Sequence, residues 1–145
     1  MTSISDETHQ RITDLCAQGD TAAGDGDFEQ ALKHFKAALA LIPEPTREHQ
    51  QNTWVRAAIG DMYFQLERFE DCREHFREAV HSPGGLGNPF IHLRLGQCAL
   101  ELGDEARAAD ELARAYMGGG EELFEGDDAK YLEFIQSRLL PPQDA

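Results

Sequence analysis

Residues 59–79 read IGDMYFQLERFEDCREHFREA, and two further stretches align with them without a gap: QGDTAAGDGDFEQALKHFKAA at residues 18–38 and LGQCALELGDEARAADELARA at residues 95–115. In each copy a glycine is followed after 12 residues by a small residue, after four more by a bulky one and after three more by alanine. These positions are Gly19, Ala31, Phe35 and Ala38, then Gly60, Cys72, Phe76 and Ala79, then Gly96, Ala108, Leu112 and Ala115. Antiparallel helices pack closely where small residues face each other and a large side chain fills the space beside them. The repeat therefore predicts three helical hairpins of one kind.

The repeated pattern resembles the tetratricopeptide repeat. The middle copy matches it best, with Ile59-Gly60 followed by the aromatic Tyr63 and then by Phe69, Cys72 and Phe76. At the position of Tyr63 the other two copies have alanine, Ala22 and Ala99. The turns inside the first and third hairpins read Gly26-Asp27 and Gly103-Asp104, where glycine can end one helix and aspartate can cap the next. The middle copy has Glu67-Arg68 there, which suits a turn less well.

The resemblance implies an all-α fold, a right-handed α-solenoid of three helix pairs closed by a C-terminal capping helix. We expect a single domain over residues 1–145, with repeats at about 12–43, 53–83 and 89–120. Tyr131, Leu132, Ile135 and Leu139 recur at helical spacing, which predicts the capping helix at about 128–140. Solenoids use such a helix to cover the open face of their last repeat.

Composition places the chain among folded, non-membrane proteins. It has 145 residues, enough for one domain, and 41% of them are hydrophobic while 28% are charged. No apolar run approaches the roughly 20 residues that span a bilayer, so no membrane association is expected. Three widely spaced cysteines argue against a disulfide framework and favour a reducing compartment. The expected location is the cytoplasm.

The net charge of −14 constrains the choice of partner. Such a field repels nucleic acid and anionic lipid and attracts cationic surfaces. We therefore expect the partner to be another protein with a basic and apolar surface, and we expect no nucleic acid. Simple solubility is the alternative reason for the acidity.

The chain lacks the patterns that catalysis, metals and cofactors require. Cys72 and His75 lie three residues apart, but no second ligand pair with zinc spacing accompanies them. His92 and Cys98 lie six apart and face different sides of a helix, so they form no nucleophile–base pair. The glycines of residues 84–87 lack the strand and lysine of a phosphate-binding loop. We predict no catalytic residue, no metal, no cofactor and no enzymatic activity.

The resemblance also implies a binding site. In this family the second, fifth, ninth and twelfth repeat positions of the first helices line a concave groove. Among the residues at these positions, the candidates for partner binding are Asp20, Trp54, Ala57, Asp61, Phe64, Phe90, Leu93, Gln97 and Leu100. The surface is apolar and aromatic with two aspartates, which suits apolar anchors beside Lys or Arg. Family members that grip a terminal carboxylate use several cationic and amide side chains there, and only Arg94 comes near. The alternative is that these aromatic residues belong to the core.

A second candidate is an acidic edge formed by Glu121, Glu122, Glu125, Asp127 and Asp128, which would dock a basic partner. The alternative is a solvated loop leading into the last helix.

These observations predict a non-catalytic protein-binding module. The chain resembles the compact tetratricopeptide proteins of bacteria, some of which act as immunity proteins, so the first hypothesis is a stoichiometric inhibitor of a basic effector or toxin. The alternatives are a chaperone or adaptor for a secretion substrate or for complex assembly, and a self-associating scaffold. A homo-oligomer remains compatible with all three.

Overall fold

The computed structural model describes residues 3–139, and it is all-α. Over these residues the chain forms seven α-helices and two short 3₁₀ helices, in the order α1 (Asp6–Gly24), α2 (Phe28–Leu39), η1 (Thr46–Glu48), α3 (Gln50–Gln65), α4 (Phe69–Val80), α5 (Pro89–Glu101), α6 (Glu105–Gly119), η2 (Glu121–Phe124) and α7 (Ala129–Leu139). Within the described range no helix is long and apolar enough to cross a membrane.

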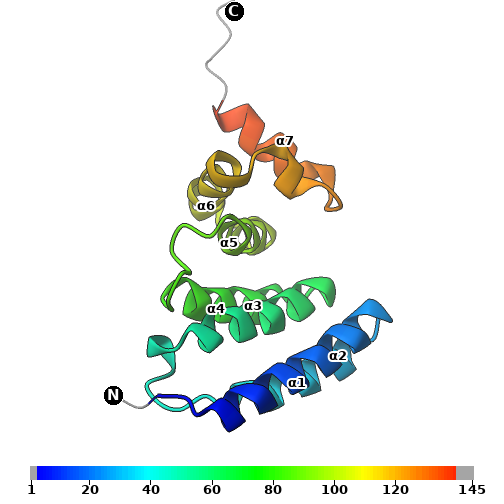
Figure 1. Cartoon of the computed structure of the whole chain (residues 1–145). Helices are drawn as coiled ribbons and strands as arrows, with labels where there is room; N and C mark the ends of the chain where they lie inside the picture. Colours follow the sequence, from blue (N-terminus) through cyan, green and yellow to red (C-terminus); the bar gives the residue numbers. More distant parts are fainter. Residues whose placement is uncertain (1–2, 140–145) are drawn as a thin grey trace, which may run out of the picture.

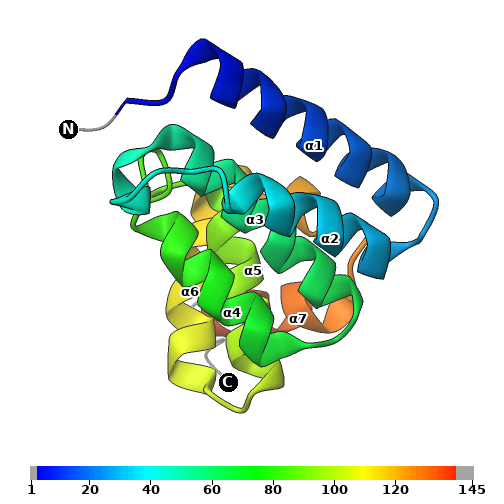
Figure 2. The same ribbon diagram turned by 90° about the horizontal axis from the view of Figure 1, so that it is seen from below.

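The helices pack as consecutive pairs. Helices α1 and α2, α3 and α4, and α5 and α6 form hairpins, and each hairpin packs on the next along the chain (Figure 1). Helices α3 and α4 run across the view of Figure 1 whereas α5 and α6 are seen nearly end-on, so successive pairs are rotated relative to one another. Figure 2 shows the same stack from below, with α1 on its outer side. The prediction of an all-α solenoid of helix pairs is confirmed.

Close glycine contacts hold each hairpin together. A Cβ atom on Gly19 would lie 2.6 Å from the Phe35 ring, one on Gly60 2.5 Å from the Phe76 ring, and one on Gly96 2.5 Å from Cγ of Leu112. The large partners are at most 2% exposed, so their rings and methyl groups have no free space to move into. The spacing that repeats in the sequence, from the glycine to the bulky residue, therefore corresponds to one packing contact that each of the three hairpins makes. The small residues of the pattern, Ala31, Ala38, Cys72, Ala79, Ala108 and Ala115, are all fully buried.

The turn inside the middle hairpin differs from the other two. Gly26 and Gly103 have φ of +80° and +83°, and Asp27 and Asp104 then cap the following helices. Glu67 occupies the equivalent position with φ of +59°, a left-handed conformation that is costly for a residue with a Cβ. The N-cap of α4 is Arg68, whose side chain makes no capping hydrogen bond.

We expect Glu67→Gly to raise the free energy of unfolding by about 1 kcal/mol, because glycine adopts positive φ without the steric cost that glutamate carries. Urea unfolding followed by circular dichroism measures this. Gly103→Ala is the matched control at the equivalent turn, and it should lower stability by a similar amount. A loss of stability in Glu67→Gly would show that the glutamate side chain contributes more than its backbone conformation costs.

The last segment packs on the third hairpin. Phe124 of η2 and Tyr131 and Ile135 of α7 are buried and form a second hydrophobic cluster with Leu93 of α5 and Leu112 of α6. The segment of residues 121–139 therefore covers one side of α5, and it is called the cap segment below.

Candidate protein-binding site

The open part of the predicted groove lies at the start of α3 and α5. Trp54 is 38% exposed there, the largest side chain among the exposed apolar residues, and Ala57 and Phe90 are partly buried beside it. Together they line a hollow of about 260 Å³, called the Trp54 hollow below. The complete lining is Gln50, Thr53, Trp54, Ala57, Pro83, Gly84, Asn88, Phe90 and Ile91.

Side-chain hydrogen bonds fix the walls of the Trp54 hollow. The Thr53 hydroxyl donates to the Pro83 carbonyl oxygen at 2.7 Å, and Nδ2 of the buried Asn52 donates to Oγ of Ser82 at 2.8 Å. On the other wall, Oδ1 of Asn88 accepts the backbone N–H of Phe90 at 3.0 Å and so caps α5. These bonds hold the loop residues Ser82, Pro83 and Asn88, two of which line the hollow, against α3 and the start of α5.

Trp54 and Phe90 contribute to the hollow in different ways. The Trp54 ring lies edge-on to the His9 ring, with centroids 6.4 Å apart, and keeps much of its surface free. The Phe90 ring also packs on Phe76, at 5.9 Å between centroids, and on the Arg94 guanidinium, at 5.0 Å. Phe90 is thus part core and part binding surface, whereas Trp54 is mainly surface.

Further along α5 the predicted groove is closed by the cap segment. Leu93 is 1% exposed and Gln97 is fully buried, which differs from the expected open surface. Arg94 lies beneath the cap, where its guanidinium donates to Asp61 of α3 at 3.0 Å and to Asp127 of the cap at 2.9 Å. Gln97 accepts from Arg94 at 2.8 Å and donates to the same Asp127 oxygen at 2.9 Å. The chain's own carboxylate thus holds the cap segment onto α3 and α5.

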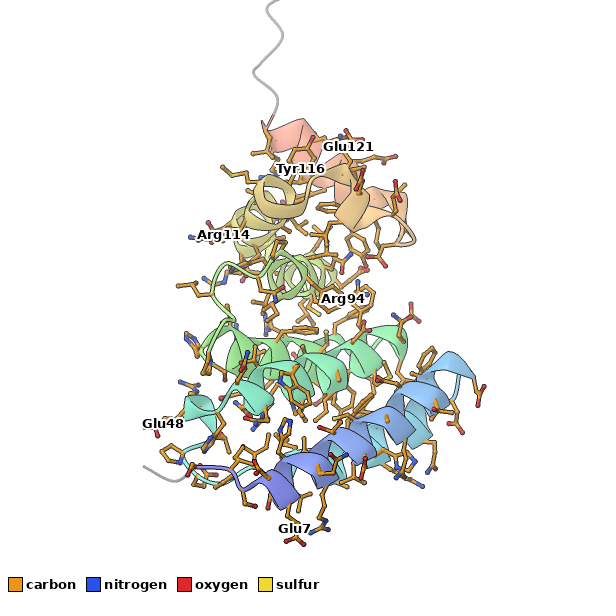
Figure 3. The ribbon with its side chains drawn as sticks, in the orientation of Figure 1. Glu7, Glu48, Arg94, Arg114, Tyr116 and Glu121 are labelled. Carbon is orange, nitrogen blue, oxygen red and sulfur yellow. The ribbon has the colours of Figure 1, made fainter. Side chains whose placement is uncertain are left out.

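Aromatic rings surround this buried ion network. The Phe64 ring lies 4.1 Å from the Arg94 guanidinium and 6.4 Å from the Tyr131 ring of α7. Burial, followed by the Glu101 carboxylate, raises the pKa of Tyr131. Figure 3 shows Arg94 on the side of α5 that faces α3 and the cap, with Arg114 of α6 projecting away on the other side. Phe64, and Leu100, which packs on the second cluster, therefore belong to the closed part of the groove.

The residues of the acidic edge also fall into an exposed group and an inward-facing one. Glu121, Glu122, Glu125 and Asp128 are exposed, whereas Asp127 turns inward to Arg94 and Gln97. The sequence pattern did not separate Asp127 from its neighbours, because all five acids lie in one polar stretch. The only signal was Arg94, a lone cation on an otherwise apolar helix face.

The groove positions on α1 carry no reactive group at neutral pH. Cys16 is at the fifth position of the first repeat, and burial, followed by the nearby Asp20 carboxylate, raises the pKa of its thiol to about 11, so Cys16 stays a thiol. Asp20 itself is exposed. Among residues 3–139 no group of three or more histidine, cysteine, aspartate or glutamate side chains is arranged to hold a metal ion.

The paired helices and the groove define a helical-repeat protein. The chain belongs to the tetratricopeptide repeat family: two models of that family, each described as tetratricopeptide repeat, match residues 11–82 and 57–123. No curated protein sequence is significantly similar to the chain.

Solved structures share this fold at low sequence identity. PcrH, in complex with the chaperone binding region of PopB, has a TM-score of 0.67 and 19% identity, covering 92% of this chain and 99% of PcrH. The N-terminal domain of stress-induced protein-1 (STI-1) from C. elegans has a TM-score of 0.65 and 20% identity, covering 90% and 98%. The Sgt2 TPR domain from Aspergillus fumigatus has a TM-score of 0.66 and 15% identity, covering 99% and 90%. At these identities the likeness concerns the fold.

Proposed function

We propose that this protein is a chaperone or adaptor that binds a segment of another protein, with the Trp54 hollow as the main contact. The observation that carries the proposal is the exposed Trp54 ring beside a preformed hollow of about 260 Å³. Aromatic side chains at such hollows are the usual energetic centres of protein interfaces. The PcrH structure supports a segment as partner, because it holds a region of PopB on a chain of the same fold.

The chemistry of the open groove indicates what the segment carries. The hollow suits one apolar anchor side chain, because its lining includes the apolar residues Trp54, Ala57, Pro83, Phe90 and Ile91. Asp20 is exposed at a predicted groove position of α1, and the Asp61 side chain keeps 28% exposure although it pairs with Arg94. A Lys or Arg near the anchor would meet these carboxylates. The partner segment is therefore apolar and basic, and it crosses α1 and α3 without entering the capped part of α5.

We expect Trp54→Ala to weaken partner binding by roughly 30-fold, the size of a hot-spot residue worth about 2 kcal/mol. Because Trp54 is exposed and Phe90 is partly core, the single Trp54 variant tests the site with less risk to the fold. Affinity is measured by calorimetry or surface plasmon resonance with the captured partner. Met117→Ala is the matched control, since Met117 is 79% exposed but lies on α6 outside the hollow. Equal affinity of Trp54→Ala and wild type would remove the hollow as the contact.

A stoichiometric inhibitor, including an immunity protein for a basic toxin, is the second candidate. The net charge of −14 and the exposed carboxylates of Glu121, Glu122, Glu125 and Asp128 support it. A tagged pull-down at low and high salt separates the two functions. One basic folded domain that is lost at high salt indicates an inhibitor, whereas unfolded or extended clients that compete with each other for the Trp54 hollow indicate a chaperone. Recovery of the chain alone, as an oligomer by solution mass, would point to a scaffold.

A further inference from the structure

The loop of residues 82–88, between α4 and α5, contributes residues to two hollows. Pro83, Gly84 and Asn88 line the Trp54 hollow. Leu86 lines a second hollow of about 560 Å³, together with His92 of α5 and Glu111 of α6. The loop is thus a wall of the candidate binding site, and its position affects the shape of that site.

The loop is held at both ends by side chains from other elements. Asn52 and Thr53 of α3 bond to Ser82 and to the Pro83 carbonyl. At the other end the backbone N–H of Gly87 donates to Nε2 of His92 at 3.0 Å. His92 is 2% exposed, and its Nδ1 lies 3.1 Å from Oε2 of Glu111 on α6, which is 5% exposed. A buried chain of bonds therefore ties the loop to the third hairpin.

These two bonds determine the protonation of His92. Because Gly87 donates an N–H to Nε2, Nε2 must carry the lone pair. The ring proton is then on Nδ1, where it is donated to the Glu111 carboxylate. A second proton, on Nε2, would place two N–H donors opposite each other, so the hydrogen bond from Gly87 would be lost. The hydrogen bond to Glu111 would become an ion pair.

We propose that His92 is a positioning residue for the Trp54 hollow: in its neutral Nδ1–H form it holds the 82–88 loop, and uptake of a second proton releases Gly87 and reshapes the hollow. The effect on the loop stands on these contacts alone, whereas its consequence for partner binding rests on the proposed function. Acidification is then a signal that lowers partner affinity.

Charged side chains on α4 and α6 line the same hollow as His92. The acidic ones are Glu111 and Asp110 of α6 and Asp104, the N-cap residue of α6. The basic ones are Arg77 of α4 and Arg107 and Arg114 of α6, and His81 lies at the end of α4. The Glu111 carboxylate is in direct contact with the His92 ring, with Oε2 3.1 Å from Nδ1.

The test compares wild type with His92→Gln and His92→Leu in the free protein. Glutamine offers an acceptor to Gly87 and a donor to Glu111 but takes up no proton, whereas leucine offers neither. We expect the protection of the Gly87 amide against hydrogen exchange, corrected for intrinsic rates, to fall roughly five- to tenfold in His92→Leu. In wild type it should fall similarly when the sample is acidified enough to protonate His92. In His92→Gln it should stay constant.

Trp54, the single tryptophan of the chain, gives an independent readout by fluorescence. Because the His9 ring lies 6.4 Å from the Trp54 ring, all variants are compared in a His9→Gln background. A pH-dependent change of Trp54 emission that disappears in His92→Gln supports the proposal, and identical pH profiles in both proteins overturn it. If the loop responds to pH but partner affinity does not, His92 keeps its positioning role and the Trp54 hollow is excluded as the contact.

Discussion

Arg94→Ala is expected to lower the free energy of unfolding by about 3–5 kcal/mol, the usual cost of removing one partner from a buried ion network. The Arg94 side chain is 7% exposed and donates to Asp61, Asp127 and Gln97. Alanine would leave the Asp127 carboxylate, which is 17% exposed, facing Asp61 with no cation between them. The cap segment would lose the Arg94 link to α3 and α5, while the Gln97–Asp127 bond and the Lys130–Glu101 ion pair would remain. Guanidinium unfolding followed by circular dichroism measures the loss.

A matched control separates burial from charge. Arg114 also pairs with an aspartate, Asp110 at 3.4 Å, but both side chains are more than half exposed. Arg114→Ala should therefore change stability by less than about 1 kcal/mol. If Arg94→Ala cost as little as Arg114→Ala, the apolar contacts and the remaining polar contacts of the cap segment, such as Lys130–Glu101, would be enough to hold it. Hydrogen exchange over α7 should increase in Arg94→Ala even where the other helices stay protected.

The paired helices were predictable from sequence because one packing contact repeats. The spacing from Gly60 to Phe76 recurs from Gly19 to Phe35 and from Gly96 to Leu112, and all three pairs are in contact. The unusual turn was visible as well, since Glu67 stands where the other copies have glycine, and it has the only positive φ of a non-glycine residue among residues 3–139. Local spacing of this kind reports directly on helix faces.

The site was harder to predict because it depends on contacts between distant residues. Repeat register placed Trp54, Leu93 and Gln97 on the groove, at the second, fifth and ninth positions of their repeats, but of these three only Trp54 is exposed in the structure. Leu93 and Gln97 are covered because Asp127, more than 30 positions away along the chain from Leu93, bonds to Arg94 and Gln97. No periodic pattern specifies such a pair. The role of His92 was hidden for the same reason, since its partners are a loop amide and a glutamate on another helix.

Phe76→Ala is expected to lower the free energy of unfolding by about 3–5 kcal/mol, as is usual for a buried phenylalanine. The Phe76 ring is fully buried, fills the space beside Gly60 and packs on Phe90, so its removal leaves a cavity between the second and third hairpins. Thermal and urea unfolding measure the loss. A loss below about 1.5 kcal/mol would mean that the neighbouring helices collapse into the space.

The same ring should determine the effect of a change at Gly60. Gly60→Ala alone places a Cβ 2.5 Å from the Phe76 ring, so we expect a loss of about 1–3 kcal/mol despite the better helix propensity of alanine. In the Phe76→Ala background the obstacle is gone, and Gly60→Ala should be neutral or stabilising by up to about 1 kcal/mol. Gly24→Ala is the control, because a Cβ there meets nothing within 4 Å. Additive effects in this double-mutant cycle would show that Gly60 and Phe76 are not one packing unit, and the spacing that predicts the fold would then need another physical origin.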